Sequence, residues 1–164
     1  MQYKSLDEVD LSKKTVLLRS DLNTPIKNGL VVNNERILRS LPTLNFIIEA
    51  GARLVILSHL GRPEENDTFQ EEFSLLPVVN EMENLLNKEI MFCNLGEFEK
   101  LDKIPKITLI ENTRFCIGEK SNDIDLSKRL AELGDLIVMD AFATSHRAHA
   151  STAGVITFSN DACA

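Results

Sequence analysis

Four short apolar runs of this chain each end abruptly in polar or charged residues. The runs lie at residues 16–18, 55–57, 107–110 and 136–139. Strands that are apolar along their whole length are typical of a parallel sheet covered on both faces. The residues that follow parallel strands lie at one edge of the sheet, where α/β proteins hold their ligands. The sequence therefore predicts a sheet edge that carries Arg, His, Asp and Asn side chains.

Segments with helical periodicity separate these runs. The predicted elements are strands 15–20, 53–58, 89–93, 106–110 and 136–139, and helices 35–50, 76–87 and 124 to about 134. Segment 94–106 has room for one short helix. Alternating strands and helices indicate parallel βαβ units with right-handed crossovers. The predicted fold class is α/β, a Rossmann-like three-layer α/β/α domain with a mainly parallel sheet.

Glycine and proline predict three local features of the first half. Pro25 and the Asn28-Gly29 pair predict a long loop over residues 21–30. Pro42 removes a backbone hydrogen bond inside the first helix, so we expect a short first turn or a kink, followed by the main helix. Gly51 is expected to end that helix.

The length of the chain and its two ends bound the domain organisation. A chain of 164 residues can bury one good core, so we expect a single domain over residues 1–164. Residues 1–14 are polar and predict a loose lead-in. After residue 156 the sequence runs out without a closing helix, so we expect a domain that is incomplete at its C-terminal end. A frayed natural terminus is the alternative.

Composition excludes several classes of partner and site. A net charge of −7 argues against nucleic acid or an acidic membrane surface. Cys93, Cys116 and Cys163 have no metal-ligand spacing, and without a secretory signal they indicate a reducing, cytoplasmic location. No apolar run approaches the ~20 residues that span a bilayer.

The arginines gather near the predicted strand ends. Arg62, Arg114 and Arg147 follow strands, and Arg36 and Arg39 lie at the start of the first helix. Guanidinium groups match planar anions with several oxygens, so this distribution predicts a local site for phosphate or carboxylate. Surface salt bridging is the alternative explanation for any single arginine.

Other polar residues near the same ends can complete such a site. Asp21 and Asn23 lie two positions apart, so in an extended stretch they could hydrogen-bond neighbouring hydroxyls of one ligand. A simple turn is the alternative. In S-H-L-G-R-P (58–63), Gly61 allows the backbone to bend while His59 and Arg62 reach an anion.

The S-H-R-A-H stretch (145–149) admits more than one role. Arg147 is a candidate ligand of an anion, whereas His146 and His149 could donate to that anion or be satisfied core residues. Zinc binding by the two histidines lacks a third ligand, and a triad of Ser145, His146 and Asp140 lacks a nucleophile elbow. We therefore expect no metal site in this chain. Neither nucleotide phosphate motif, G-x-x-x-x-G-K-[ST] or G-x-G-x-x-G, occurs.

Six motifs in order resemble the N-terminal domain of the phosphoglycerate kinase family. They are R-S-D-L-N-T-P (19–25), N-E-R-I-L-R-S-L-P-T (34–43), S-H-L-G-R-P (58–63), F-S-L-L-P-V (73–78), I-E-N-T-R-F (110–115) and D-A-F-A-T-S-H-R-A-H-A-S-T-A-G-V (140–155). The resemblance implies a glycolytic enzyme that transfers a phosphoryl group reversibly between 1,3-bisphosphoglycerate and ADP, giving 3-phosphoglycerate and ATP. It also implies a small-molecule substrate, and we expect a monomer.

The resemblance assigns roles to individual residues. The residues implied to hold 3-phosphoglycerate or the 1,3-bisphosphate are Asp21, Asn23, Arg36, His59, Arg62, Arg114 and Arg147. Arg36 is also implied to be catalytic, because it would stabilise the phosphoryl group in flight. Mg-ATP or Mg-ADP would bind a second domain that follows the first, so no cofactor-binding residue is expected in this chain.

One consequence and two alternatives follow if the nucleotide domain lies outside this chain, as the resemblance implies. The chain alone is expected to have no kinase activity. One alternative is a non-catalytic module that binds phosphorylated acids. The other is a fragment that folds but binds its ligand weakly, because closure of a cleft usually completes such a site.

Four residues depart from the family's usual pattern. Ser20, Leu22, Thr24 and Thr113 stand where a small apolar residue, an aromatic, valine and leucine are usual. They flank the polar candidates rather than replace them. The departures therefore bear on local packing more than on the site.

Overall fold

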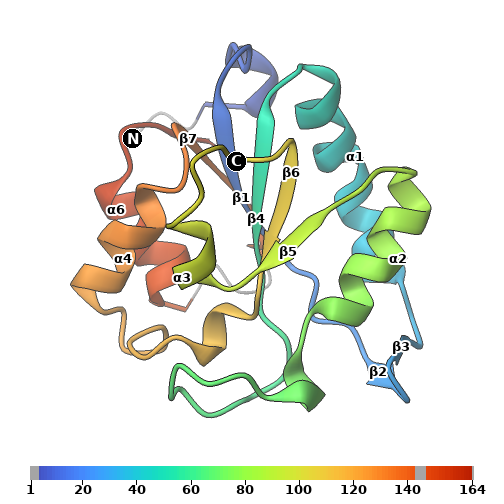
Figure 1. Ribbon diagram of the computed structural model, residues 1–164. Helices are drawn as coiled ribbons and strands as arrows, with labels where there is room; N and C mark the ends of the chain where they lie inside the picture. The colour runs from blue at the N-terminus through green and yellow to red at the C-terminus, as the bar shows by residue number, and fades with distance from the viewer. Residues whose placement is uncertain (1–3, 143–146, 164) are drawn as a thin grey trace.

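The computed structural model of the chain describes residues 4–142 and 147–163. Its centre is a six-stranded sheet in which every neighbouring pair is parallel (Figure 1). In sheet order the strands are β5 (Met91–Cys93), β6 (Ile107–Ile110), β4 (Arg53–Leu57), β1 (Thr15–Ser20), β7 (Leu136–Asp140) and β8 (Ala162–Cys163). The parallel sheet predicted from the apolar runs is confirmed.

Helices cover both faces of the sheet and make three layers (Figure 1). One face is covered by α1 (Glu35–Glu49) and α2 (Leu76–Leu86). The other is covered by α3 (Leu95–Phe98), α4 (Ile124–Ala131) and α6 (Val155–Phe158). The Rossmann-like α/β/α fold class is therefore confirmed, and α3 is the short helix for which segment 94–106 had room.

The alternation of side chains along the central strands explains why the domain has two hydrophobic clusters, one on each face of the sheet. Val16 and Leu18 of β1 belong to the cluster that packs on α1 and α2, whereas Leu17 belongs to the cluster on α3 and α4. Successive side chains of a strand point to opposite faces, so a strand between two helical layers must be apolar at every position. All six residues of β1 are buried.

The first helix differs from its prediction, because α1 runs unbroken through Pro42. The predicted division into a short first turn and a separate main helix is therefore wrong, whereas the alternative, a kink at Pro42, stays a prediction. Proline removes the hydrogen bond to the carbonyl four residues earlier, that of Leu38. Pro42 is exposed and Leu38 is 44% exposed, so water can reach this carbonyl. Buried Leu44 and Ile47 continue the apolar face beyond the proline.

The long loop predicted over residues 21–30 includes most of a short hairpin, whose two strands were not predicted. Strands β2 (Ile26–Lys27) and β3 (Leu30–Val31) pair antiparallel. Asn28 and Gly29 between them have φ of 53° and 73°. Two positive φ values in a two-residue connection suit a tight hairpin turn, so the predicted turn itself is confirmed. Gly51, with φ of 79°, ends α1 as predicted.

The two ends of the chain are more ordered than the sequence predicted. A π-helical segment, η4 (Ala150–Gly154), leads directly into α6, and β8 then pairs with β7. The expectation that no helix follows residue 156 was therefore wrong, because α6 extends to Phe158. Lys4 forms a parallel bridge with Cys163, and Leu11 is buried, so the lead-in packs on the domain.

No helix in residues 4–142 and 147–163 is long and apolar enough to cross a membrane.

Candidate functional site

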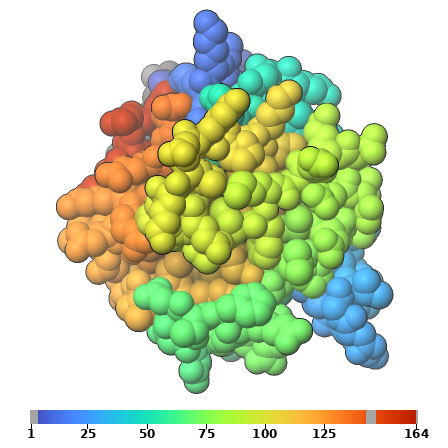
Figure 2. All heavy atoms as spheres, in the orientation of Figure 1, coloured from blue at the N-terminus to red at the C-terminus, as the bar shows by residue number. Residues whose placement is uncertain are grey.

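The carboxyl ends of β1, β4, β6 and β7 lie at one edge of the sheet, the lower edge in Figure 1. Arg19, near the end of β1, is in register with Leu57 of β4 and Met139 of β7. The space-filling view shows the β2–β3 hairpin and the loop after β4 as two projections at this edge (Figure 2). Polar groups that are far apart in the sequence are therefore delivered to one region, as the strand pattern predicted.

Arg36 and Asp21 form an ion pair at this edge. Arg36 lies in the first turn of α1 and its Nη1 donates to Asp21 Oδ2. The Arg36 side chain is 45% exposed and that of Asp21 15% exposed. The other oxygen of Asp21 accepts from the backbone N–H of Asn23 at 3.3 Å. The structure thus brings together three of the predicted residues, and it leaves the Arg36 guanidinium accessible to solvent.

Gly61 connects the loops that follow β1, β4 and β6. Its N–H donates to Asn23 Oδ1 at 2.9 Å, and its carbonyl accepts from Arg114 Nη1. Asn112 also links the loops after β6 and β4, because its Nδ2 donates to the carbonyl of Leu60 at 2.8 Å. Asn112 Oδ1 accepts from the Arg114 N–H at 3.1 Å. Arg114 is 6% exposed, so its guanidinium is held in a fixed position.

His59 is buried beside Arg19. The two residues are 3% and 2% exposed, and Arg19 Nη2 lies 3.1 Å from His59 Nδ1. Arginine can only donate, so this contact assigns an unprotonated Nδ1 and places the hydrogen on Nε2. Burial, followed by the charges of Arg19, Arg114 and Arg147, lowers the pKa of His59 to about 3. His59 is therefore a neutral N–H donor at physiological pH.

Arg62 and Arg147 each lie within electrostatic reach of Arg114. Burial lowers the pKa of Arg114 first, and the charges of Arg147 and Arg62 lower it further. Arg62 and Arg147 are exposed, and neither makes an ion pair within residues 4–142 and 147–163. We call the region formed by Asp21, Asn23, Arg36, His59, Arg62, Arg114 and Arg147 the cationic rim.

His149 lies close to the cationic rim, whereas Ser145 and His146 fall outside the described residues. Burial and then the charges of Arg114 and Arg147 lower the pKa of His149. His149 is therefore shifted toward its neutral form by the same arginines that act on His59. The zinc and triad hypotheses both require His146, so the described residues do not test them.

Two buried residues beneath the rim were not among the sequence candidates. Arg19 is buried, and burial lowers its pKa to about 10 against the opposing charges of Glu119 and Asp21. An arginine within an apolar strand was a signal that could have identified it. Glu119 has no exposed surface and lies in a connection without a recognisable motif. Nothing in the local sequence pattern distinguished it.

The four departures from the family pattern are buried around the rim, each 3% exposed or less: Ser20, Leu22, Thr24 and Thr113. Thr113 Oγ1 donates to the carbonyl of Ser58 at 3.1 Å, and Thr24 Oγ1 donates to the carbonyl of Asn33. Buried hydroxyls need such partners. The two threonines therefore hold the loops of the site by hydrogen bonds.

The fold and the site together define a Rossmann-like α/β domain whose strand ends carry an arginine- and histidine-rich rim. The phosphoglycerate kinase family model matches residues 6–164, and the chain belongs to this family. The family assigned from the six motifs is thereby confirmed. The functions of the individual rim residues stay predictions.

Relatives and solved structures agree with this assignment. The chain is 48% identical over 159 residues to phosphoglycerate kinase of Coxiella burnetii (strain RSA 493 / Nine Mile phase I), covering 97% of this chain and 40% of the relative. It is 43% identical over 165 residues to phosphoglycerate kinase of Desulfovibrio desulfuricans, covering 100% of this chain and 42% of the relative. The chain thus spans about two fifths of the length of these relatives.

Two solved structures share the fold. The phosphoglycerate kinase structure from Coxiella burnetii matches with a TM-score of 0.90 and 47% identity, over 99% of this chain and 41% of the other. The structure from Pyrococcus horikoshii OT3 matches with a TM-score of 0.82 and 28% identity, over 97% of this chain and 42% of the other. The fold is therefore retained at much lower identity.

Proposed function

We propose that this chain is the substrate-binding N-terminal domain of a glycolytic phosphoglycerate kinase. The enzyme would transfer a phosphoryl group reversibly between 1,3-bisphosphoglycerate and ADP, and this domain would hold 3-phosphoglycerate. The observation that supports the proposal is the convergence of three arginines and a neutral histidine at the strand ends. Phosphate and carboxylate oxygens are the groups that such donors recognise.

The contacts of the rim suggest a division of roles. Arg62, Arg114 and Arg147 would neutralise the phosphate of the substrate. His59 would add one hydrogen bond from Nε2 without adding charge, because Nδ1 is occupied by Arg19. A carboxylate oxygen of Asp21 would accept from the hydroxyl of the three-carbon acid. The amide nitrogen of Asn23 would donate to its carboxylate, since Asn23 Oδ1 already accepts from the N–H of Gly61.

Arg36 is the proposed catalytic residue. Its ion pair with Asp21 holds a partly exposed guanidinium at the helix start. Phosphoryl transfer requires mainly positioning and neutralisation of charge, and an arginine at the transferred group supplies both. In the longer enzyme, Arg36→Ala should therefore lower kcat much more than it weakens binding of 3-phosphoglycerate. An equal loss of binding and turnover would contradict a catalytic role.

The nucleotide would bind outside these 164 residues. We propose that Mg-ATP or Mg-ADP binds a second domain of a longer parent protein, since the relatives exceed the length of this chain. The chain alone would then be inactive and monomeric. Turnover of 1,3-bisphosphoglycerate and ADP by the purified chain would contradict this part of the proposal.

Titration of 3-phosphoglycerate into the chain, followed by amide NMR shifts, tests the binding site. The largest shifts are expected at Gly61, residues 112–115 and residues 147–152, because these carry or support the rim arginines. Glycerate, which lacks the phosphate, serves as the matched control ligand and should produce much smaller shifts. Absence of shifts at the strand ends with 3-phosphoglycerate would refute the proposed site.

A further inference from the structure

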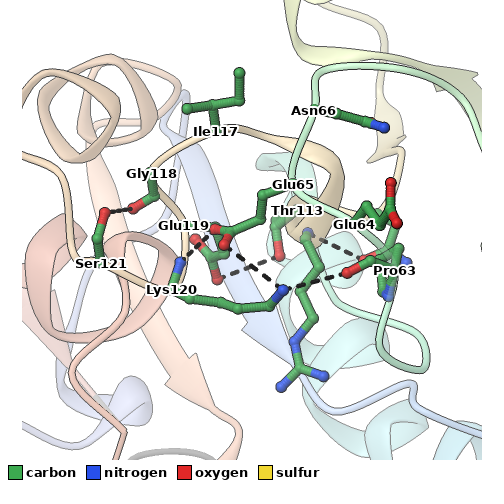
Figure 3. A network of polar contacts seen from close by, with 12 residues as sticks. Pro63, Glu64, Glu65, Asn66, Thr113, Ile117, Gly118, Glu119, Lys120 and Ser121 are labelled. Carbon is green, nitrogen blue, oxygen red and sulfur yellow. Dashed lines mark hydrogen bonds and ion pairs between the residues drawn. The ribbon is translucent and has the colours of Figure 1, made fainter.

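A fully buried carboxylate, Glu119, lies beneath the cationic rim. It belongs to the connection between helix η3 (Thr113–Phe115) and α4, beside Thr113 and Lys120 (Figure 3). Its Oε1 accepts from Ser151 Oγ at 2.5 Å and its Oε2 accepts from the Ser151 N–H at 2.9 Å. The backbone carbonyl of Glu119 also accepts from the N–H of Ala150 at 2.9 Å. Glu119 thus fixes the first residues of η4 by three hydrogen bonds.

These contacts continue as one directional chain of hydrogen bonds to His59. Ser151 donates its hydroxyl hydrogen to Glu119, so the lone pairs of Oγ remain free to accept from Arg19 Nε at 3.1 Å. Arg19 then donates from Nη2 to His59 Nδ1 at 3.1 Å. Each hydrogen bond in the series can run in only one direction, because a carboxylate only accepts and a guanidinium only donates. The series ends in a histidine whose hydrogen is on Nε2.

Glu119 also provides a counter-charge for a buried cation. Arg19 is 2% exposed, and a buried charge that loses its partner destabilises the fold strongly. Burial raises the pKa of Glu119, whereas hydrogen bonds from Ser151 and the charges of Arg19 and Arg114 oppose this rise. The backbone N–H and the hydroxyl of Ser151 both point at the carboxyl group, which suits its ionised form, because that form only accepts.

A negative charge beneath an anion site opposes anion binding electrostatically. The charge of Glu119 therefore does not account for its position, whereas its hydrogen bonds do. We propose that Glu119 is a positioning residue, which holds Ser151 and Arg19 so that His59 presents its Nε2–H to the substrate. The inference rests on the proposed binding of 3-phosphoglycerate only for its effect on affinity. The effect on His59 is independent of any ligand.

Two variants interrupt the series at different points. Glu119→Gln removes the charge and one acceptor, and Ser151→Ala removes the bridging hydroxyl but keeps the carboxylate. The matched control is Glu65→Gln, which removes a carboxylate that also faces Arg114 and His149 but pairs with Lys120. Glu65 makes no hydrogen bond to Ser151 or Arg19 among the described residues.

The first readout is the 15N NMR signature of the His59 ring without ligand. In the unmodified chain we expect a neutral ring with hydrogen on Nε2 and no titration down to about pH 5. Glu119→Gln and Ser151→Ala should each mix the two tautomers or raise the pH at which the ring protonates. Glu65→Gln should leave the His59 signals unchanged. An unchanged His59 ring in both interrupting variants would overturn the proposal.

The second readout is the dissociation constant of 3-phosphoglycerate. Both interrupting variants should raise it about tenfold, because a misoriented Nε2–H loses one hydrogen bond to the ligand. The double variant should be no weaker than either single one, since both act through one series. Tighter binding by Glu119→Gln would overturn the proposal, because it would show that the charge matters more than the geometry.

The two readouts separate this inference from the proposed function. If the unmodified chain fails to bind 3-phosphoglycerate, the proposed function fails, and the His59 signature still decides the role of Glu119. If Glu119→Gln does not fold, Ser151→Ala decides, because it leaves the counter-charge of Arg19 in place. A folded Ser151→Ala variant with an unaltered His59 ring and unaltered affinity would refute the positioning role.

Discussion

Acidification should destabilise the chain through His59 before the ordinary carboxylates are protonated. Burial and neighbouring arginines lower the pKa of His59 from 6.5 to about 3. The folded state therefore keeps this ring neutral in a range where the unfolded chain binds a proton. The stabilisation is fully present above the unfolded pKa of about 6.5 and is lost as the pH falls toward about 3. At about pH 5 the loss amounts to about 2 kcal/mol, from about 1.4 kcal/mol per pH unit.

Urea unfolding between about pH 7.5 and about pH 5 measures this loss. The control is His59→Asn, whose amide oxygen can accept from Arg19 in place of Nδ1 and does not titrate. Other titrating groups contribute to both proteins, so only the difference in unfolding free energy is compared. The difference in unfolding free energy between the two proteins should change by about 2 kcal/mol between about pH 7.5 and about pH 5. The change should be at the expense of the unmodified chain, because only its residue 59 titrates. A difference independent of pH would refute a neutral, buried His59.

Further predictions concern the substrate site and the packing beneath it. Arg62→Ala should weaken binding of 3-phosphoglycerate by about 1.5 to 3 kcal/mol, as measured by calorimetry, because a charge-assisted contact is lost. Arg39→Ala, which removes an exposed arginine from the same helix as the catalytic candidate, should change affinity by less than about 1 kcal/mol; equal effects of the two variants would contradict a specific role for Arg62. Gly154→Ala should lower the unfolding free energy by about 1 to 3 kcal/mol, because its Cβ would collide with Ser127 Oγ. Gly96→Ala, whose Cβ would meet nothing nearer than 3.5 Å, is the matched control in thermal unfolding, and an equal melting temperature for both variants would show that the contact at residue 154 relaxes freely.

The sequence predicted the sheet because its central strands are buried on both faces. Such strands are unbroken apolar runs, and the polar residues after them mark the edge where the rim forms. The short strand β8 lacks this signal, because Ala162–Cys163 contains only two residues. Its pairing with β7 depends on the path of η4 and α6, which no local pattern specified. The predicted break of the first helix at Pro42 was wrong because the buried residues beyond the proline keep α1 packed on the sheet, and local sequence does not show such packing.

The sequence named the residues of the rim, whose functions stay predictions, but it did not predict the contacts between them. Strand ends identified His59 and Arg114 because polar residues after parallel strands share one edge. The Asp21–Arg36 ion pair joins residues from a loop and a helix that only the folded chain brings together. Glu119 is still harder to find, because the residue that satisfies it, Ser151, is 32 positions away in the sequence.

Gly61 holds three loops together although it has no side chain. Its N–H and its carbonyl are both engaged, one by Asn23 and the other by Arg114, and its φ of 61° favours glycine. Its amide hydrogen can exchange with deuterium only when the contact to Asn23 opens. The exchange rate of this single hydrogen would therefore measure how often the loops after β1 and β4 separate, and its slowing would register any ligand that draws them together.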